Sequence, residues 1–124
     1  MDTKVDETYR SPNAIEWALL KKLLGKSFPG RDELVGQLDS LSVKPIDTEG
    51  SLSLRPSPLA APAPVEERVV SEGNYSDEDA DLSEGSHVNV LLYVVKGLLA
   101  ELEIYKDDGS PIKKGPLAES LIFY

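Results

Sequence analysis

The chain has 124 residues, carries a net charge of −9 and contains no cysteine. Its length suits a single domain with its own core, and the missing thiols exclude disulfides and thiolate metal sites. The excess of 22 acidic over 13 basic residues disfavours nucleic-acid and membrane partners, because both binding modes depend on Lys and Arg meeting phosphates.

The first ten residues, MDTKVDETYR, are polar and lack the apolar region of a secretory signal. We expect residues 1–10 to form a flexible N-terminus. The longest uninterrupted apolar run, Val90 to Val95, is too short to cross a bilayer. The sequence therefore predicts a cytoplasmic protein.

Two helices are expected next. Ser11 can cap the first helix, with Pro12 at its first position and Gly25 just beyond its end. Its apolar residues recur at helical spacing and predict one buried face, formed by Ile15, Leu19, Leu20, Leu23 and Leu24. A second helix is expected over 31–40. The short connection between the two predicts a helical hairpin.

After residue 41 the apolar residues alternate with the period of a strand. LSVKPID (41–47) predicts an edge strand because Pro45 cannot donate to a ladder. SLSLR (51–55) and VEERVVSEG (65–73) predict two further strands. A proline-rich loop, 55–64, separates these two.

HVNVLLYVV (87–95) and LLAELEIYK (98–106) predict a β-hairpin whose two-residue turn is Lys96-Gly97. Alternation predicts an apolar face that packs on the helices and includes Leu98, Ala100, Leu102 and Ile104. The opposite face would then carry Leu99, Glu101, Glu103 and Tyr105. The tail, PLAESLIFY (116–124), is apolar enough to dock as a last strand or a short helix.

These elements predict an α+β fold in which an N-terminal helical hairpin packs on a mainly antiparallel sheet of four or five strands. Residues 11–124 would form the single domain, with the proline-rich loop at 55–64 and an acidic loop at 74–86.

The acidic loop, NYSDEDADLSEGS, holds five acidic residues and no basic one. Asp77, Asp79 and Asp81 match the first three ligand positions of a calcium-binding loop. The glycine and glutamate that this loop requires are replaced by Leu82 and Val88. We therefore predict no metal site and no cofactor, and interpret the segment as a solvated loop or as part of an acidic docking surface.

Glu101 and Glu103 lie two residues apart on one strand, so their side chains point to the same side, roughly 7 Å apart. Such a pair can act as an acid and a base in a cleft, or it can belong to a solvated outer sheet face. Tyr93 and Tyr105 are expected on the same face, and tyrosine beside carboxylates is typical of protein interfaces. With no Cys and a single His, the sequence offers little for nucleophilic catalysis.

The segments LLGKSFPGRDELVGQL, EGSLSL and GLLAELEIYKDDGSPI together resemble a family of small uncharacterised bacterial proteins. The resemblance covers about residues 11–116 and implies a C-terminal hairpin but no activity.

The sequence favours a small acidic, non-enzymatic protein-binding module, such as an immunity or inhibitor protein for a basic protein partner. The alternatives are a homodimeric structural or adaptor protein and, less favoured, an enzyme that uses Glu101 and Glu103. The oligomeric state is left open between monomer and homodimer. The predicted partner-binding residues are Asp77, Glu78, Asp79, Asp81, Glu84, Tyr93, Glu101, Glu103 and Tyr105.

Overall fold

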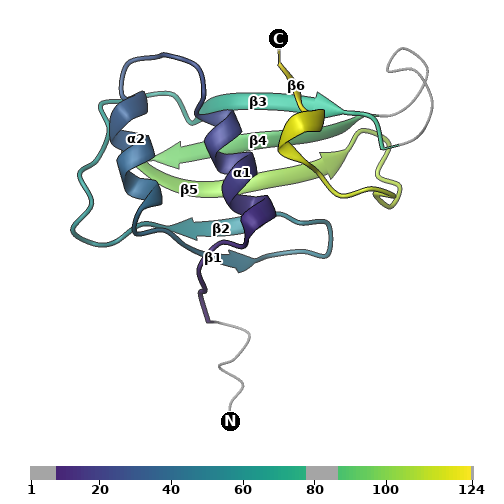
Figure 1. The fold of residues 1–124 in the computed structure, drawn as a ribbon, viewed down its shortest axis with the longest axis horizontal. Coiled ribbons are helices and arrows are strands. Elements are labelled where there is room, and N and C mark those ends of the chain that lie inside the picture. The colour runs from purple at the N-terminus through teal and green to yellow at the C-terminus, as the bar shows by residue number, and fades with distance from the viewer. Residues whose placement is uncertain (1–7, 78–86, 124) are drawn as a thin grey trace.

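The computed structural model describes residues 8–77 and 87–123, in which two α-helices lie over one face of a six-stranded antiparallel sheet (Figure 1). The helices are α1 (Ala14–Leu23) and α2 (Arg31–Leu38). The strands are β1 (Ser42–Pro45), β2 (Leu52–Arg55), β3 (Val69–Tyr75), β4 (Val88–Val95), β5 (Leu98–Lys106) and β6 (Ile122–Phe123). None of the helices in these residues is long and apolar enough to span a bilayer.

The strand order is β1-β2-β5-β4-β3-β6, and every neighbouring pair is antiparallel. The α+β class is confirmed, but the prediction of four or five strands was too low. The apolar tail forms a 3₁₀ turn at Ala118–Ser120 and then β6, which pairs with the end of β3. Pro45 lies in the edge strand β1, where its missing donor costs no ladder bond.

Helix α1 begins later than the sequence predicted, because Asn13 is its N-cap. The Asn13 side chain accepts a hydrogen bond from the Glu16 N–H at 2.8 Å, and the Glu16 carboxylate accepts one from the Asn13 N–H at 2.9 Å. This reciprocal capping box satisfies two donors that would otherwise be unpaired at the helix start. The predicted cap at Ser11 and helical Pro12 are therefore wrong by two residues.

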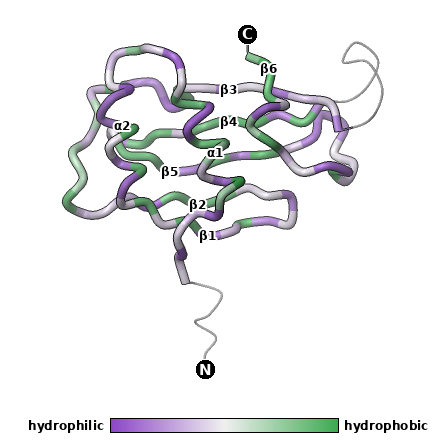
Figure 2. Tube along the Cα trace, viewed as in Figure 1, coloured by the Kyte–Doolittle hydropathy of each residue, from purple (hydrophilic) through white to green (hydrophobic). Residues whose placement is uncertain are grey.

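Five apolar residues were expected on the buried face of the first helix, and four of them are buried, namely Leu19, Leu20, Leu23 and Leu24. Ile15 was also predicted to be buried, but 52% of it is exposed. Helix α1 packs against the 3₁₀ turn at Ala118–Ser120 and against β3, whereas α2 packs against β5, so the predicted helical hairpin is not clearly formed. Hydrophobic residues recur along β4 and β5, and the core lies between these strands and the helices (Figure 2).

The hairpin of β4 and β5 is confirmed, with Lys96 and Gly97 both at positive φ in the turn. Tyr93 pairs with Glu101 and Val94 with Leu99, so Ala100 is an extra residue that forms a β-bulge. The bulge turns Leu99 into the core, where it is 1% exposed. The predicted inward positions of Leu98 and Ala100 are therefore wrong, whereas the alternation from Glu101 to Tyr105 is as predicted.

Gln37 of α2 joins three parts of the chain that are far apart in sequence. Its side-chain amide N–H groups donate to the carbonyl oxygens of Ala61 and Gly97, and its amide oxygen accepts from the Leu99 N–H, each at 2.9 Å. The Ala63 N–H donates to the Gly97 carbonyl oxygen at 2.8 Å. These bonds hold the proline-rich loop against α2 and the hairpin turn.

The N-terminal side of the described chain contacts the sheet. Arg10 forms an isolated antiparallel bridge with Val43 of β1, through backbone hydrogen bonds of 2.8 and 2.7 Å. Residues 9 and 10 were assigned to the flexible N-terminus, but Arg10 extends the edge of the sheet and Tyr9 packs beside it.

Candidate functional site

Four predicted site residues, Tyr93, Glu101, Glu103 and Tyr105, lie on the outer face, the side of the sheet that points away from the helices. The Tyr93 hydroxyl donates a hydrogen bond of 2.8 Å to Glu103 Oε1. That bond raises the pKa of Tyr93, and burial and the charges of Glu103 and Glu101 act in the same direction. Tyr93 is therefore a neutral donor held between two carboxylates, while Tyr105 is 41% exposed nearby.

A basic cluster borders these carboxylates on β1 and β2. The Arg55 guanidinium carbon lies 3.7 Å from the centroid of the Tyr9 ring, and Lys44 Nζ lies 5.3 Å from it. The Tyr9 hydroxyl shares a 2.8 Å hydrogen bond with Ser53 Oγ, and Ser53 pairs directly with Glu101. The outer face is thus divided into a basic half on β1 and β2 and an acidic half on β5, β4 and β3.

Asp77 does not belong to an exposed acidic surface. Its side chain is fully buried, and its Oδ1 lies 3.1 Å from Nζ of Lys106, whose side chain is 1% exposed. The Lys113 N–H also donates to Asp77 Oδ2 at 2.6 Å. Burial opposes ionisation of Asp77, but the hydrogen bonds from Lys113 and Lys106 and the Lys106 charge outweigh it and lower the pKa of Asp77. The assignment of Asp77 to the docking surface is therefore corrected to a buried ion pair.

The remaining predicted acids, Glu78, Asp79, Asp81 and Glu84, lie outside the described residues, as does most of the calcium-like sequence. Within 8–77 and 87–123, no group of three or more His, Cys, Asp or Glu side chains is placed to hold a metal ion. Asn74 and Tyr75 belong to β3, so the segment between β3 and β4 is shorter than the acidic loop predicted over 74–86.

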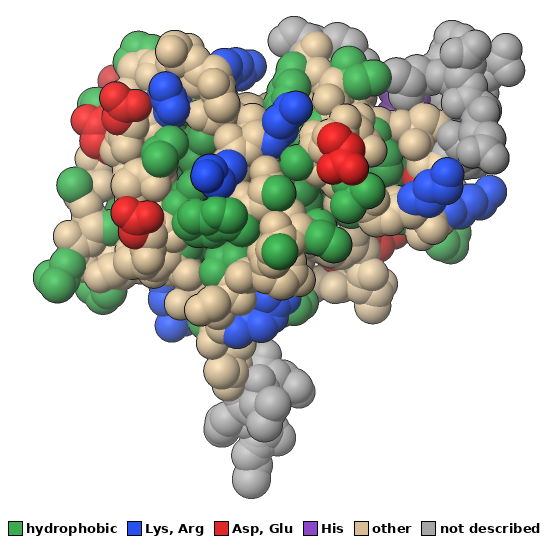
Figure 3. Space-filling model, in the orientation of Figure 1, with side chains coloured by type: hydrophobic (Ala, Val, Ile, Leu, Met, Phe, Trp, Pro, Cys, Tyr) green, Lys and Arg blue, Asp and Glu red, His purple; other side chains and the backbone are tan. Residues whose placement is uncertain are grey.

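An apolar cavity of about 500 Å³ lies between α1, β5 and the segment that leads to β6. On the face seen in Figure 3, hydrophobic side chains gather over α1 and towards that segment. Leu19, Leu102 and Ile104 line the cavity and are almost fully buried, whereas Ile15 and Leu117 line it and are exposed. Neither Glu101 nor Glu103 lines it.

The far wall of this cavity is fixed by the buried polar residues. The Tyr75 hydroxyl donates to the Lys114 carbonyl oxygen at 2.6 Å, next to the bond between Lys113 and Asp77. Burial, and then the charge of Asp77, raise the pKa of Tyr75. This network was not among the features expected from the sequence. The position of Lys106 on the inward side of β5, with Leu102 and Ile104, was the signal that could have revealed it.

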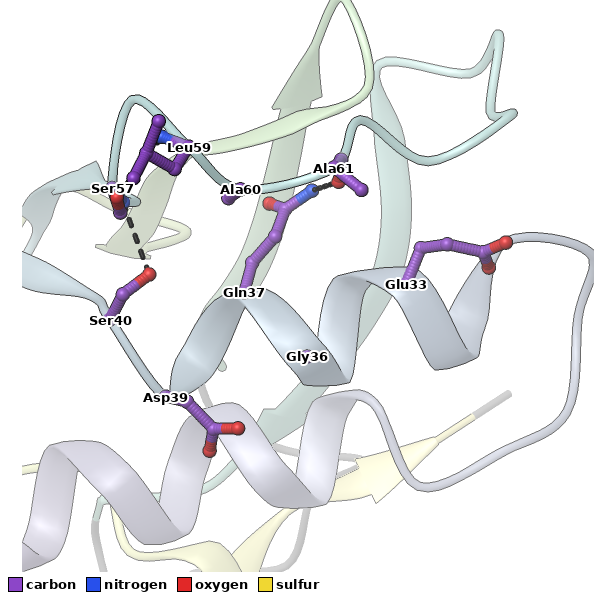
Figure 4. Close-up of a pocket in the computed structure, with 9 residues that line it drawn as sticks. All are labelled: Glu33, Gly36, Gln37, Asp39, Ser40, Ser57, Leu59, Ala60 and Ala61. Carbon is purple, nitrogen blue, oxygen red and sulfur yellow. Dashed lines mark hydrogen bonds between the residues drawn. The ribbon is translucent and has the colours of Figure 1, made fainter.

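A second cavity, of about 410 Å³, lies between α2 and the proline-rich loop (Figure 4). Gln37 points from α2 towards the loop and bonds to Ala61, and Ser40 Oγ accepts from the Ser57 N–H at 3.1 Å. Leu59 is 94% exposed at the apex of the loop. The two hydrogen bonds fix the loop on either side of this residue.

A protein-family model described as a domain of unknown function (DUF6984) matches residues 9–116. This range contains both helices, β1 to β5 and the outer face, and it ends before β6. No curated protein and no solved structure gives a significant match to the chain.

Proposed function

This chain belongs to the family described as a domain of unknown function (DUF6984), and on that premise we propose that it is a non-enzymatic module that binds a basic protein. The proposed docking surface is the acidic half of the outer face, which we define as Glu72, Tyr93, Glu101, Glu103 and Tyr105. An inhibitor or immunity protein that acts in the cytoplasm is the role that this surface fits best.

The observation that carries the proposal is the hydrogen-bonded pair of Tyr93 and Glu103, which lies beside Glu101 on central strands. Tyrosines on a rigid strand offer a large contact area at little conformational cost, and they are enriched at interaction hot spots. Carboxylates beside them select a partner with matching positive charge.

The acidic half is continuous across three strands. Leu91 pairs with Glu103 on one side and with Glu72 on the other, so an apolar side chain separates two acids. An apolar centre with a charged rim is the arrangement that protein interfaces use. The four acids within residues 78–86 follow β3 in the sequence, and their charge would accelerate the encounter with a basic protein.

The basic cluster of Lys44 and Arg55 supports the second candidate, a homodimeric adaptor. A face with both signs of charge is partly self-complementary, so the basic part of one copy can meet the acidic half of another. Sedimentation equilibrium distinguishes the two candidates: the binding module is a monomer when alone, whereas the adaptor is a dimer.

The binding proposal is tested with the double variant Glu101→Lys and Glu103→Lys. A basic protein captured from lysate of the source cells is purified, and its affinity is then measured for the wild type and the variant over a series of salt concentrations. We expect the variant to bind at least tenfold more weakly and to show a smaller salt dependence, because two interfacial charges are reversed.

The matched control is Glu33→Lys with Asp39→Lys, which makes the same charge change at exposed positions on and beside α2. The control should bind like the wild type apart from a small loss of long-range attraction. Equal weakening by the two double variants would show that net charge alone matters and would reject the outer face as the docking surface.

A further inference from the structure

We propose that the uncovered edge of β3, beside the end of α1, is a binding site for an extended peptide of a partner protein that carries an acidic side chain. The peptide would add a strand to the sheet next to residues 69–71. This site is a margin of the sheet and not its outer face. The inference therefore goes beyond the proposed function and does not depend on it.

The edge of β3 is covered by another strand over only part of its length. Within residues 8–77 and 87–123, β6 pairs with β3 at Gly73 and Asn74, and no strand lies on that side of residues 69–72 (Figure 1). The opposite margin of the sheet is protected, because Pro45 lacks a donor and Arg10 bridges to β1. An uncovered edge presents backbone N–H and C=O groups with which an extended peptide can pair.

Two cavities beside this edge offer room for side chains of the peptide. One, of about 300 Å³, is lined by residues 69–72 and Lys26. The other, of about 350 Å³, is lined in part by Lys22, Lys26 and Phe123. Residues 69 and 70 are valines, and like Phe123 they are only half-buried. A bound peptide would therefore cover apolar area that is still open to water.

The charge around these cavities selects an acidic side chain. Lys22 and Lys26 are exposed, and neither forms a hydrogen bond or an ion pair with another residue in the described part of the chain. Glu72 lines the smaller cavity, but it pairs with Leu91 and belongs to the outer face. A carboxylate on the helix-covered side of the edge is therefore attracted by two lysines, and an ammonium group is repelled.

Ser71 sets the position of that acidic side chain. It pairs with Leu92, which is fully buried, so both residues point to the helix-covered side. Ser71 is 3% exposed, and its Oγ has no hydrogen-bond partner among the residues that the structure describes. The residue directly opposite Ser71 on an added strand points to the same side, with the two Cβ atoms about 4.5–5.5 Å apart. A carboxylate there can accept a hydrogen bond from the Ser71 hydroxyl and lie beside Lys26.

The shape of the edge favours a peptide over a second copy of this chain. Val70 is the extra residue of a β-bulge opposite Tyr93 and Leu92, and a bulge hinders pairing between two sheets. The stretch between the bulge and β6 is too short to bury the roughly 1,200–2,000 Å² of a stable protein interface. A peptide held by a few backbone bonds and by contacts with Ser71 and Lys26 needs no longer edge.

The test uses isothermal titration calorimetry of the full chain with the blocked peptide Thr-Val-Glu-Val-Thr and with the same peptide carrying glutamine in place of glutamate. We expect saturable binding of the glutamate peptide, at least fivefold tighter than that of the glutamine peptide, because only the carboxylate attracts the lysines. Lys26→Gln should reduce this preference at least threefold. Ser71→Ala should weaken the glutamate peptide without lowering the melting temperature of the free protein, because its Oγ has no hydrogen bond to lose.

Pairing through the backbone is tested with two further peptides, in which one or the other alternate set of backbone N–H groups is methylated. Only alternate N–H groups of an added strand face its neighbour in the sheet. One methylated peptide should therefore lose binding, and the other should bind like the unmethylated glutamate peptide.

Lys21→Gln is the matched control, since it removes the same charge from an exposed lysine of α1 that lines neither cavity. Circular dichroism shows whether each variant is folded. The inference is overturned if the glutamate peptide does not bind saturably, if glutamate and glutamine peptides bind equally, if the two methylated peptides bind alike, or if Lys21→Gln and Lys26→Gln behave alike. A dimer that the glutamate peptide dissociates would also overturn it, because a second copy would then occupy the edge. The Glu101→Lys and Glu103→Lys variant should keep the preference for glutamate, which keeps this result distinct from that of the docking proposal.

Discussion

Replacing Asp77 by Asn tests whether the buried ion pair with Lys106 holds this end of the sheet together. Asn keeps the shape of the side chain and can still accept the Lys113 N–H, but it removes the carboxylate charge that faces the Lys106 ammonium at 1% exposure. Removing one partner of a buried pair costs about 3–5 kcal/mol. For a domain whose total stability is about 5–15 kcal/mol, a loss of this size is easily measured by urea unfolding.

A double-mutant cycle isolates the pair itself. Lys106→Met removes the charge and fills a similar volume, so the single variant leaves Asp77 as the buried unpaired charge and should also cost about 3 kcal/mol. The double variant Asp77→Asn with Lys106→Met buries no net charge. We expect it to be at least 2 kcal/mol more stable than the sum of the single losses predicts. Additive losses within about 0.5 kcal/mol would refute the coupling of the two residues.

The same pair predicts how stability depends on pH. The pKa of Asp77 is lowered in the folded protein, because its hydrogen bonds and the Lys106 charge outweigh burial. Its contribution is therefore fully present above the unfolded value of about 3.9 and is lost as the pH falls through the folded value. Unfolding measured between pH 7 and pH 2 should show this loss in the wild type and not in Asp77→Asn. Parallel curves for the two proteins would contradict the ion-pair assignment.

Three further predictions concern the hydrogen bonds and the turn. Gln37→Leu should destabilise the protein by about 2–4 kcal/mol in urea unfolding, because the Leu99 N–H and the Ala61 carbonyl lose the hydrogen bonds to Gln37, and the Gly97 carbonyl keeps only the one from the Ala63 N–H. A loss below about 0.5 kcal/mol would show that water replaces the amide. Gly97→Ala should cost at least about 2 kcal/mol, because a Cβ at φ +80° would lie 2.5 Å from the Ala63 carbonyl oxygen. One kcal/mol shifts the melting temperature of a domain of this size by about 4 °C, so a melting temperature within about 2 °C of the wild type would show that the loop moves freely. Tyr75→Phe should cost about 1 kcal/mol at pH 7. Because burial, followed by the Asp77 charge, raises the pKa of Tyr75, wild-type stability should decline once the pH exceeds about 10, and Tyr75→Phe should lack that decline.

The helices and most of the strands could be predicted from the sequence, because the spacing of their apolar residues matches the positions that are buried in the fold. Both helices and five strands were predicted, and the sixth strand lies in a tail for which the sequence allowed either structure. Predictions failed where a local feature overrode the period. The bulge at Ala100 adds one residue to β5 and exchanges the sides of Leu98 and Leu99, which alternation alone does not reveal. The capping box at Asn13 shifts the start of α1 and leaves Ile15 exposed.

The candidate site was predictable only in part, because burial decides what an acidic residue does. Alternation correctly placed Glu101, Glu103, Tyr93 and Tyr105 on one face. Asp77 resembles its acidic neighbours in the sequence, but Lys106 and the Lys113 backbone enclose it. The inward position of Lys106 indicates a buried partner, but Asp77 lies 29 residues away, so no local pattern identifies it as that partner. The apolar cavity depends on the packing of three distant segments and had no sequence signal of its own.

The proline-rich loop offers a place where foreign peptides could be displayed. Ser57 is fixed to Ser40 on one side of the apex and Ala61 to Gln37 on the other, while Leu59 between them is almost fully exposed. Lengthening a loop whose ends are already fixed costs only about 0.6 kcal/mol for each doubling of its length. An epitope or a fluorescent reporter inserted next to Leu59 would therefore leave the sheet, the apolar cavity and the outer face undisturbed.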